Sequence, residues 1–112
     1  MTAIEVSNSI RLPVLLSQEI NTTLYRIVQE SLTNIHKHAD ATMVTVGLQQ
    51  QAGQIYLSIS DNGKGFDPAQ NTTGFGLQGM RERVAALSGQ FAIYSASDNG
   101  CRISVALPSQ NI

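Results

Sequence analysis

Four polar residues, Arg26, Glu30, Asn34 and His38, recur at intervals of four in one segment of the chain, and Lys37 lies beside them. On a helix, residues at this spacing stack along one side. A carboxylate, an amide oxygen and a basic residue on one helical face can hold a hydrated Mg²⁺ ion together with the phosphates that the ion bridges. The alternative is an ordinary solvated face, because polar residues at this spacing occur on nearly every surface helix.

A second motif, Asp61-Asn62-Gly63-Lys64-Gly65-Phe66-Asp67, follows directly after a segment of alternating apolar residues. A carboxylate at the end of a buried strand would lie at the rim of a cavity, where it could accept a hydrogen bond from an exocyclic amine such as that of adenine. Gly63 and Gly65 would let the backbone approach a flat ligand closely. The same two glycines exclude an EF-hand calcium loop, which needs oxygen ligands at its third and fifth positions. A plain turn remains the alternative.

A third motif, Gly74-Phe75-Gly76-Leu77-Gln78-Gly79, matches the letters of the G-x-G-x-x-G fingerprint. The context differs, because that fingerprint follows a strand directly, whereas residues 68–73 are polar loop. A glycine-rich turn at the start of a helix nevertheless presents unpaired N–H groups and the positive end of the helix dipole to an anion. The motif therefore predicts phosphate binding, and it shares one long loop, 61–79, with the motif before it. Loops of this length are usually functional.

Two helices are expected to carry these motifs. Apolar residues recur at spacings of three and four from Ser17 to Ala39, which predicts one amphipathic helix with Ser17 as its N-cap. A second helix is expected to include Leu77 and to end before Gly89, a residue type that commonly follows a helix.

Alternating apolar residues predict the strands of a sheet, and Ile4 and Val6 suggest a further short strand. The four main strands are expected at 42–49, 54–60, 91–95 and 101–107. Each helix needs a surface on which to bury its apolar stripe, and a sheet with one apolar face supplies it. The predicted fold class is therefore α/β: a two-layer sandwich with a mixed sheet covered on one face by helices. A single domain is expected over 1–112, with frayed ends at about 1–10 and 109–112.

Composition excludes several classes of protein. The 112 residues carry seven Lys and Arg against eight Asp and Glu, a formal charge of −1, so we expect neither nucleic acid nor a membrane surface as a partner. Cys101 is the lone cysteine, which excludes an internal disulfide, and we expect it to be a small core residue. With only His36 and His38 beside it, zinc ligands are too few. No apolar run approaches the roughly 20 residues that cross a bilayer, so a cytoplasmic chain is expected.

The order and spacing of the three motifs resemble the ATP-binding catalytic domain of a sensor histidine kinase, within the group that also includes gyrase, Hsp90 and MutL. The matching stretches are the N box, 24–39, the G1 box, 61–66, and the G2 box, 74–80, which continues to Val84. The amino-acid sequence of these boxes is most similar to that of the branch typified by nitrate/nitrite sensors. The resemblance covers about 12–108 and implies a Bergerat-type ATP-binding fold.

The resemblance also implies roles for individual residues. Asn34 would be the Mg²⁺ ligand and Glu30 a polarising or general-base carboxylate, while Lys37 and His38 would approach the phosphates. Asp61 would bind the adenine amine. The other implied nucleotide-binding residues belong to the G1 and G2 boxes and are Gly63, Gly65, Phe66, Gly74, Gly76, Leu77 and Gly79, with 67–73 as the ATP lid.

The function implied by the resemblance is transfer of the γ-phosphoryl group of ATP to a histidine on a separate helical dimerisation domain, with a response regulator acting downstream. No two-helix segment of that kind occurs in the chain, so we expect a monomeric catalytic fragment of a homodimeric parent protein. Three alternatives remain. They are an ATPase of the same group in which Glu30 activates water, a non-catalytic nucleotide-binding module, and an anti-sigma-type serine kinase.

Overall fold

The structure is a computed structural model that describes residues 5–11, 17–65, 76–95 and 98–109. Within these ranges, five strands and three helical segments follow one another. In order they are β1 (Glu5–Arg11), α1 (Gln18–Asn34), η1 (Ile35–Ala39), β2 (Met43–Gln51), β3 (Gln54–Asp61), α2 (Leu77–Ala86), β4 (Gln90–Ser95) and β5 (Cys101–Pro108).

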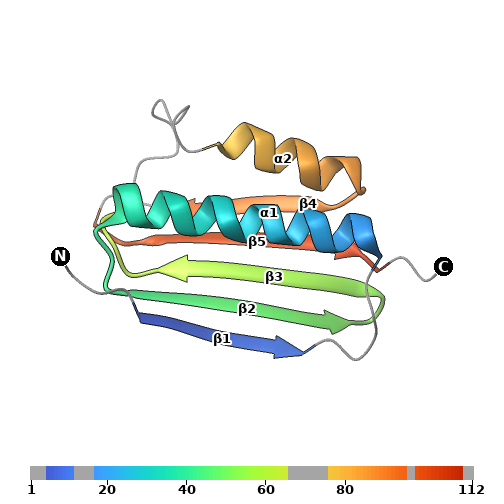
Figure 1. Ribbon diagram of the computed structural model, residues 1–112, viewed down its shortest axis with the longest axis horizontal. Coiled ribbons are helices and arrows are strands. Elements are labelled where there is room, and N and C mark those ends of the chain that lie inside the picture. The colour runs from blue at the N-terminus through green and yellow to red at the C-terminus, as the bar shows by residue number, and fades with distance from the viewer. Residues whose placement is uncertain (1–4, 12–16, 66–75, 96–97, 110–112) are drawn as a thin grey trace.

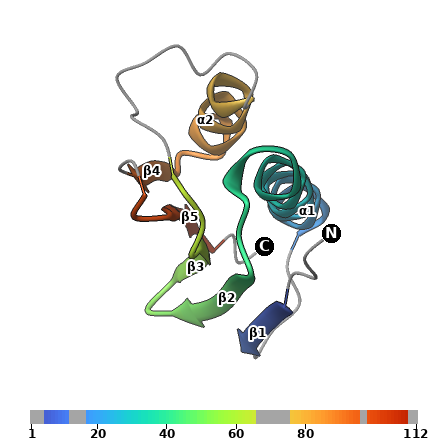
Figure 2. The ribbon, with the colours of Figure 1, turned by 90° about the vertical axis from the view of Figure 1, so that its left-hand side faces the viewer.

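The strands form one sheet in the order β1-β2-β3-β5-β4 (Figure 1). Strand β1 pairs with β2 in parallel, whereas the other neighbours are antiparallel, so the sheet is mixed. Both α1 and α2 lie on the same face of this sheet (Figure 2). The predicted two-layer α/β sandwich with helices on one face is therefore confirmed.

Helix α1 begins where the sequence predicts. Ser17 has an extended backbone, and its Oγ accepts a hydrogen bond from the N–H of Ile20 over 3.2 Å, which satisfies one of the amides left unpaired at a helix start. The apolar stripe faces inward, with Ile20, Leu24 and Ile27 at most 5% exposed. The last five residues of the predicted helix, Ile35–Ala39, continue in the wider π form instead of the α form.

The core lies between the helices and the inner face of the sheet. Its strand residues alternate with less buried ones and are Val44, Val46, Ile55, Leu57, Ile59, Ile103, Val105 and Leu107. Burying each side chain of this size stabilises the fold by roughly 1.5–3 kcal/mol relative to exposure. Met80 and Val84 of α2 complete the core, and the Oγ of buried Ser31 on α1 donates to the Met80 Sδ over 4.0 Å.

The short strand that Ile4 and Val6 suggest is present as β1, which includes Val6. The predicted fraying does not extend to residues 5–10, because this segment pairs with β2, a long-range partner that local sequence does not show. At the other end, Ser109 is also held, since its N–H donates to the Gly53 carbonyl over 2.8 Å.

The β2–β3 hairpin is tighter than predicted. Its turn consists of Ala52 and Gly53 alone, because β2 extends to Gln51. Both turn residues have positive φ, as a two-residue type I′ turn requires.

Candidate functional site

A cavity of about 330 Å³ opens at the end of the molecule where η1 ends and β3 leads into the long loop. This volume falls in the range of about 300–1,000 Å³ that is typical of small-molecule sites. The lining residues come from both layers and are Ser31, Asn34, Ile35, Lys37, His38, Ala39, Ile59, Asp61, Lys64, Gly65, Leu77, Ile93, Cys101 and Ile103.

Asp61 is the carboxylate of this cavity. It is the last residue of β3, and Ile59 of the same strand and Ile103 of the neighbouring β5 line the same space. Its Oδ1 accepts a hydrogen bond from the N–H of Gly63 over 2.7 Å. Burial raises the pKa of the Asp61 carboxyl above its usual value, and the Gly63 hydrogen bond opposes that rise. A half-buried carboxylate among isoleucines is suited to bind a hydrogen-bond donor on an otherwise apolar ligand.

The loop after Asp61 is attached to the end of η1. The N–H of Lys64 donates to the Ala39 carbonyl over 2.8 Å. A Cβ at Gly63 would lie 2.2 Å from the same carbonyl oxygen, so only glycine allows this approach. The side chain of Asn62 adds a second attachment, because its Oδ1 accepts from the N–H groups of Thr42 and Met43, each over 3.0 Å.

The same loop is also attached to the β4–β5 turn. The N–H of Asp98 donates to the Lys64 carbonyl. Gly100 has positive φ, and a Cβ there would lie 2.3 Å from the Asp61 carbonyl oxygen. The backbone that carries Asp61 is therefore fixed between η1 and the end of the sheet.

Basic side chains line the same cavity as Asp61. Lys37 and His38 belong to η1, whereas Lys64 belongs to the loop after β3. Lys37 and Lys64 are the only two lysines in the sequence. In a chain whose formal net charge is −1, this concentration of positive charge favours an anionic group on the ligand.

Helix α2 begins beside the cavity. Gly76, its N-cap, has φ +67°, and a Cβ there would lie 2.1 Å from Oε1 of Glu30. Glu30 therefore contacts the start of α2 but does not line the cavity. Gly79 lies in the first turn of α2, and a Cβ there would meet no atom of the described residues within 4 Å. Glycine in a helix costs about 1 kcal/mol relative to alanine, and no described contact explains that cost.

The structure brings together part of the predicted set of site residues. Those that line the cavity are Asn34, Lys37, His38, Asp61, Gly65 and Leu77. Glu30, Gly63 and Gly76 support its walls without lining it, and Gly79 faces open space. Phe66, Gly74 and the proposed lid, 67–73, lie outside the described residues.

Three polar residues of the cavity, Ser31, Lys64 and Cys101, were not predicted as site residues. Lys64 lies between the two glycines of the G1 box, and its position there was the available signal. Cys101 begins β5 and is paired with Asp61 across the sheet, a register that local sequence does not show. It is partly buried and packs against the core, but it also lines the cavity, so its assignment as a plain core residue was incomplete. Burial, with the Asp61 charge, raises the pKa of the Cys101 thiol to about 11.

A Mg²⁺ ion in this cavity would depend on few protein ligands, with waters and phosphates completing its coordination. Among the described residues, no group of three His, Cys, Asp or Glu side chains could hold a metal ion. Mg²⁺ does not need such a group, because it usually keeps several waters and takes one or two protein ligands together with phosphates. The Asn34 side chain, which lines the cavity, has an amide oxygen of the required kind. No helix in the described part of the chain is long and apolar enough to cross a membrane.

Known proteins match this chain in sequence and in fold. The family described as Histidine kinase-, DNA gyrase B-, and HSP90-like ATPase matches residues 19–111. The signal transduction histidine-protein kinase/phosphatase UhpB of Salmonella typhimurium is 45% identical over 97 residues, which are 87% of this chain and 19% of that protein. The sensor histidine kinase LiaS of Bacillus subtilis is 37% identical over 94 residues, 83% of this chain and 26% of LiaS.

The fold is also found in a solved structure. The ATP-binding domain of PrrB from Mycobacterium tuberculosis superposes with a TM-score of 0.77 at 20% identity, covering 96% of this chain and 82% of that one. The chain spans about a fifth to a quarter of the length of the curated relatives UhpB and LiaS. The match over residues 19–111, the similarity to the two kinases and the shared fold agree: the chain belongs to the family of histidine kinase-, DNA gyrase B- and HSP90-like ATPases, as an ATP-binding domain of the sensor histidine kinase type.

Proposed function

We propose that the cavity binds ATP with its adenine against Asp61 and its phosphates toward Lys37 and His38. The observation that carries this proposal is that one cavity is lined by two kinds of group. They are the carboxylate of Asp61, which lies among apolar side chains, and the basic side chains of η1 and of the loop after β3. Adenine presents an amine on an apolar ring, and the triphosphate is a polyanion, so the two ends of ATP match the two kinds of lining.

Asn34 is the proposed protein ligand of Mg²⁺. Its amide oxygen is a hard ligand on the same helical segment as Lys37, and both residues line the cavity. When bound, the ion would neutralise charge on the phosphates. Gly79 supports a phosphate position at the start of α2, because the open space at its Cα would admit an anion next to the first-turn N–H groups.

In the parent protein, the proposed reaction is transfer of the γ-phosphoryl group to a histidine of a separate dimerisation domain. Such a transfer needs positioning and charge neutralisation more than covalent work by the protein. Lys37 and His38 would hold the phosphates, and Asp61 would fix the base. Glu30 is the proposed catalytic carboxylate. It would accept the proton from the incoming imidazole or orient that ring, and it lies exposed against the first residue of the G2 turn that the structure describes.

The finer assignments belong to the same proposal. The similarity to UhpB and LiaS, together with the amino-acid sequence of the motifs, supports the proposal that the parent is a sensor kinase that passes its phosphoryl group to a response regulator. We place the chain in the nitrate/nitrite-sensor-like branch, as a single domain over 1–112 on the cytoplasmic side of a homodimeric parent.

A phosphotransfer assay tests this proposal. The chain would be incubated with ATP labelled in the γ-phosphate and with a separately purified acceptor domain from a similar sensor kinase. We expect label on the acceptor that is labile to acid and stable to base, as a phosphohistidine is. Glu30→Gln should slow the transfer while leaving ATP affinity within about twofold of the wild type, since Glu30 lies outside the cavity lining.

Two outcomes would count against phosphotransfer. Release of inorganic phosphate without acceptor labelling, abolished in Glu30→Gln, would identify an ATPase. Tight ATP binding with neither product would identify a non-catalytic nucleotide-binding module.

A further inference from the structure

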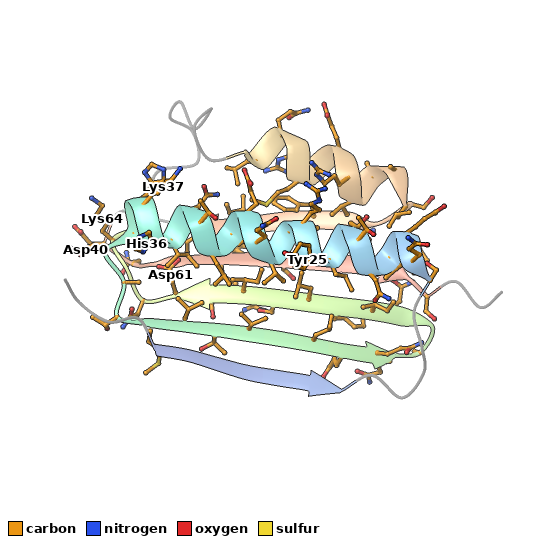
Figure 3. The ribbon with its side chains drawn as sticks, in the orientation of Figure 1. Tyr25, His36, Lys37, Asp40, Asp61 and Lys64 are labelled. Carbon is orange, nitrogen blue, oxygen red and sulfur yellow. The ribbon has the colours of Figure 1, made fainter. Side chains whose placement is uncertain are left out.

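Lys64 is the cationic residue of the cavity to which the motif-based assignment gives no role. It lies between Gly63 and Gly65, and it lines the same cavity as Lys37. The two lysines come from different segments of the chain, Lys37 from η1 and Lys64 from the loop that follows β3. Figure 3 shows both side chains at the same end of the molecule as Asp61.

The backbone of Lys64 is fixed on both sides. Its N–H donates to the Ala39 carbonyl over 2.8 Å, and its own carbonyl accepts from the N–H of Asp98. The neighbouring Gly63 packs so closely on Ala39 that it allows no Cβ. The Cα of Lys64 therefore has a defined position beside the cavity.

The charge of Lys64 is not neutralised by the described part of the chain. The side chain is exposed, and it forms no ion pair with a described residue. Asp40 lies at the same end of the molecule (Figure 3), but the two side chains are not paired. An ammonium group that lines a cavity without a carboxylate partner is available to an anionic ligand.

We propose that Lys64 binds the phosphates of the nucleotide together with Lys37, so that the cavity selects nucleoside di- and triphosphates over the monophosphate and the nucleoside. The inference rests on the proposed function, because it assumes that the phosphates lie at the cationic end of the cavity. A second cation that lines the cavity adds attraction that grows with the number of phosphate charges within its reach. It adds nothing for adenosine, which carries no charge.

The test is calorimetric titration of Lys64→Gln with ATP, ADP, AMP and adenosine, with EDTA and then with Mg²⁺. Gln keeps most of the side-chain length and removes the charge. We expect ATP and ADP to bind about 3- to 10-fold more weakly, as for the loss of one exposed charge-assisted contact, and AMP and adenosine to change less than about twofold. The logarithm of Kd for ATP should also depend less steeply on the logarithm of salt concentration.

Two further variants control the measurement. Lys64→Arg keeps the charge and should restore most of the ATP affinity. Arg83→Gln removes one positive charge from the last turn of α2, which does not line this cavity, and should leave ATP affinity nearly unchanged. Thermal melting of each variant should give a Tm close to that of the wild type.

The outcomes separate this inference from the proposed function. If the wild type does not bind ATP, the proposed function fails and the role of Lys64 fails with it. If the wild type binds ATP and Lys64→Gln behaves like Arg83→Gln, the proposed function stands and the role of Lys64 is wrong. An equal loss for ATP and adenosine would also overturn the inference, because it would show an effect on the base or on the fold.

Discussion

Gly63 and Ala39 approach so closely that a Cβ on Gly63 would lie 2.2 Å from the Ala39 carbonyl oxygen. This contact joins the loop that follows Asp61 to the end of the segment that carries Lys37 and His38. The same short backbone segment thus joins the part of the cavity formed by Asp61 to the part formed by Lys37 and His38. The position of Asp61 relative to the cationic side chains depends on that contact.

Gly63→Ala should therefore weaken both the fold and the site. The added methyl group would push against backbone, which cannot rotate away, and it would strain the hydrogen bond from the Lys64 N–H to Ala39. We expect a loss of about 1–3 kcal/mol in the free energy of unfolding and weaker ATP binding under conditions where the variant is folded. Gly47→Ala is the matched control, because a Cβ at Gly47 meets nothing within 4 Å. Equal urea midpoints for the wild type and Gly63→Ala would contradict a close contact between Gly63 and the Ala39 carbonyl.

Gly79→Ala should separate stability from binding. A methyl group at this position meets no described atom, and alanine favours a helix over glycine by up to about 1 kcal/mol, so the free energy of unfolding should rise. If the phosphates lie against the first turn of α2, the same methyl group should weaken ATP binding while adenosine binding stays the same. A variant that is more stable and binds ATP as tightly as the wild type would remove Gly79 from the site.

The Asp61 carboxyl should make stability depend on pH. Because burial raises its folded-state pKa above the ordinary value of 3.8, the protonated form is favoured by folding. Its stabilising contribution is full below that ordinary pKa and is lost as pH rises through the raised one. We expect the difference in free energy of unfolding between the wild type and Asp61→Asn to fall across this window and to be flat above it. A difference that rises with pH there would show that the folded state favours the charged form.

Cys101 should be a slow nucleophile that the nucleotide protects. Its thiol has a pKa of about 11, so little thiolate exists at pH 8, and alkylation by iodoacetamide should be about 100-fold slower than for a free cysteine. Saturating ATP should slow the reaction further, because Cys101 lines the cavity. Rapid labelling that ATP does not affect would show that the thiol faces away from the nucleotide. Mass spectrometry of timed samples measures both rates.

Local patterns were sufficient for most of the elements. The apolar spacing from Ile20 to Ile35 predicts the long helix, and the alternation of Ile55, Leu57 and Ile59 predicts a strand with one buried face. These predictions succeed because each depends on residues within one turn or one strand. The predicted fraying was wrong for residues 5–10, because β1 is held by pairing with β2, more than thirty residues away.

The same distinction applies to the site. Asp61 and its glycines could be found from their spacing, whereas the place of Cys101 depends on the register of β3 against β5, which pairs it with Asp61. The π form of Ile35–Ala39 was equally hidden, since the apolar spacing there fits an α-helix as well. Glu30 has the helical phase of Asn34, yet it contacts the start of α2 and does not line the cavity. Whether Glu30 lines the cavity depends on how α2 packs against α1.

The most direct test of the account is calorimetric titration of the wild type and Asp61→Asn with ATP and with ITP, which carries a carbonyl oxygen where ATP has the exocyclic amine. We predict one site that prefers ATP, and a loss of about 10- to 100-fold in ATP affinity in Asp61→Asn, as for a hydrogen bond to a charged group, with the fold retained. ITP affinity should change much less. Equal affinity of the wild type for the two nucleotides, or unchanged ATP binding in Asp61→Asn, would contradict the claim that Asp61 recognises adenine in this cavity.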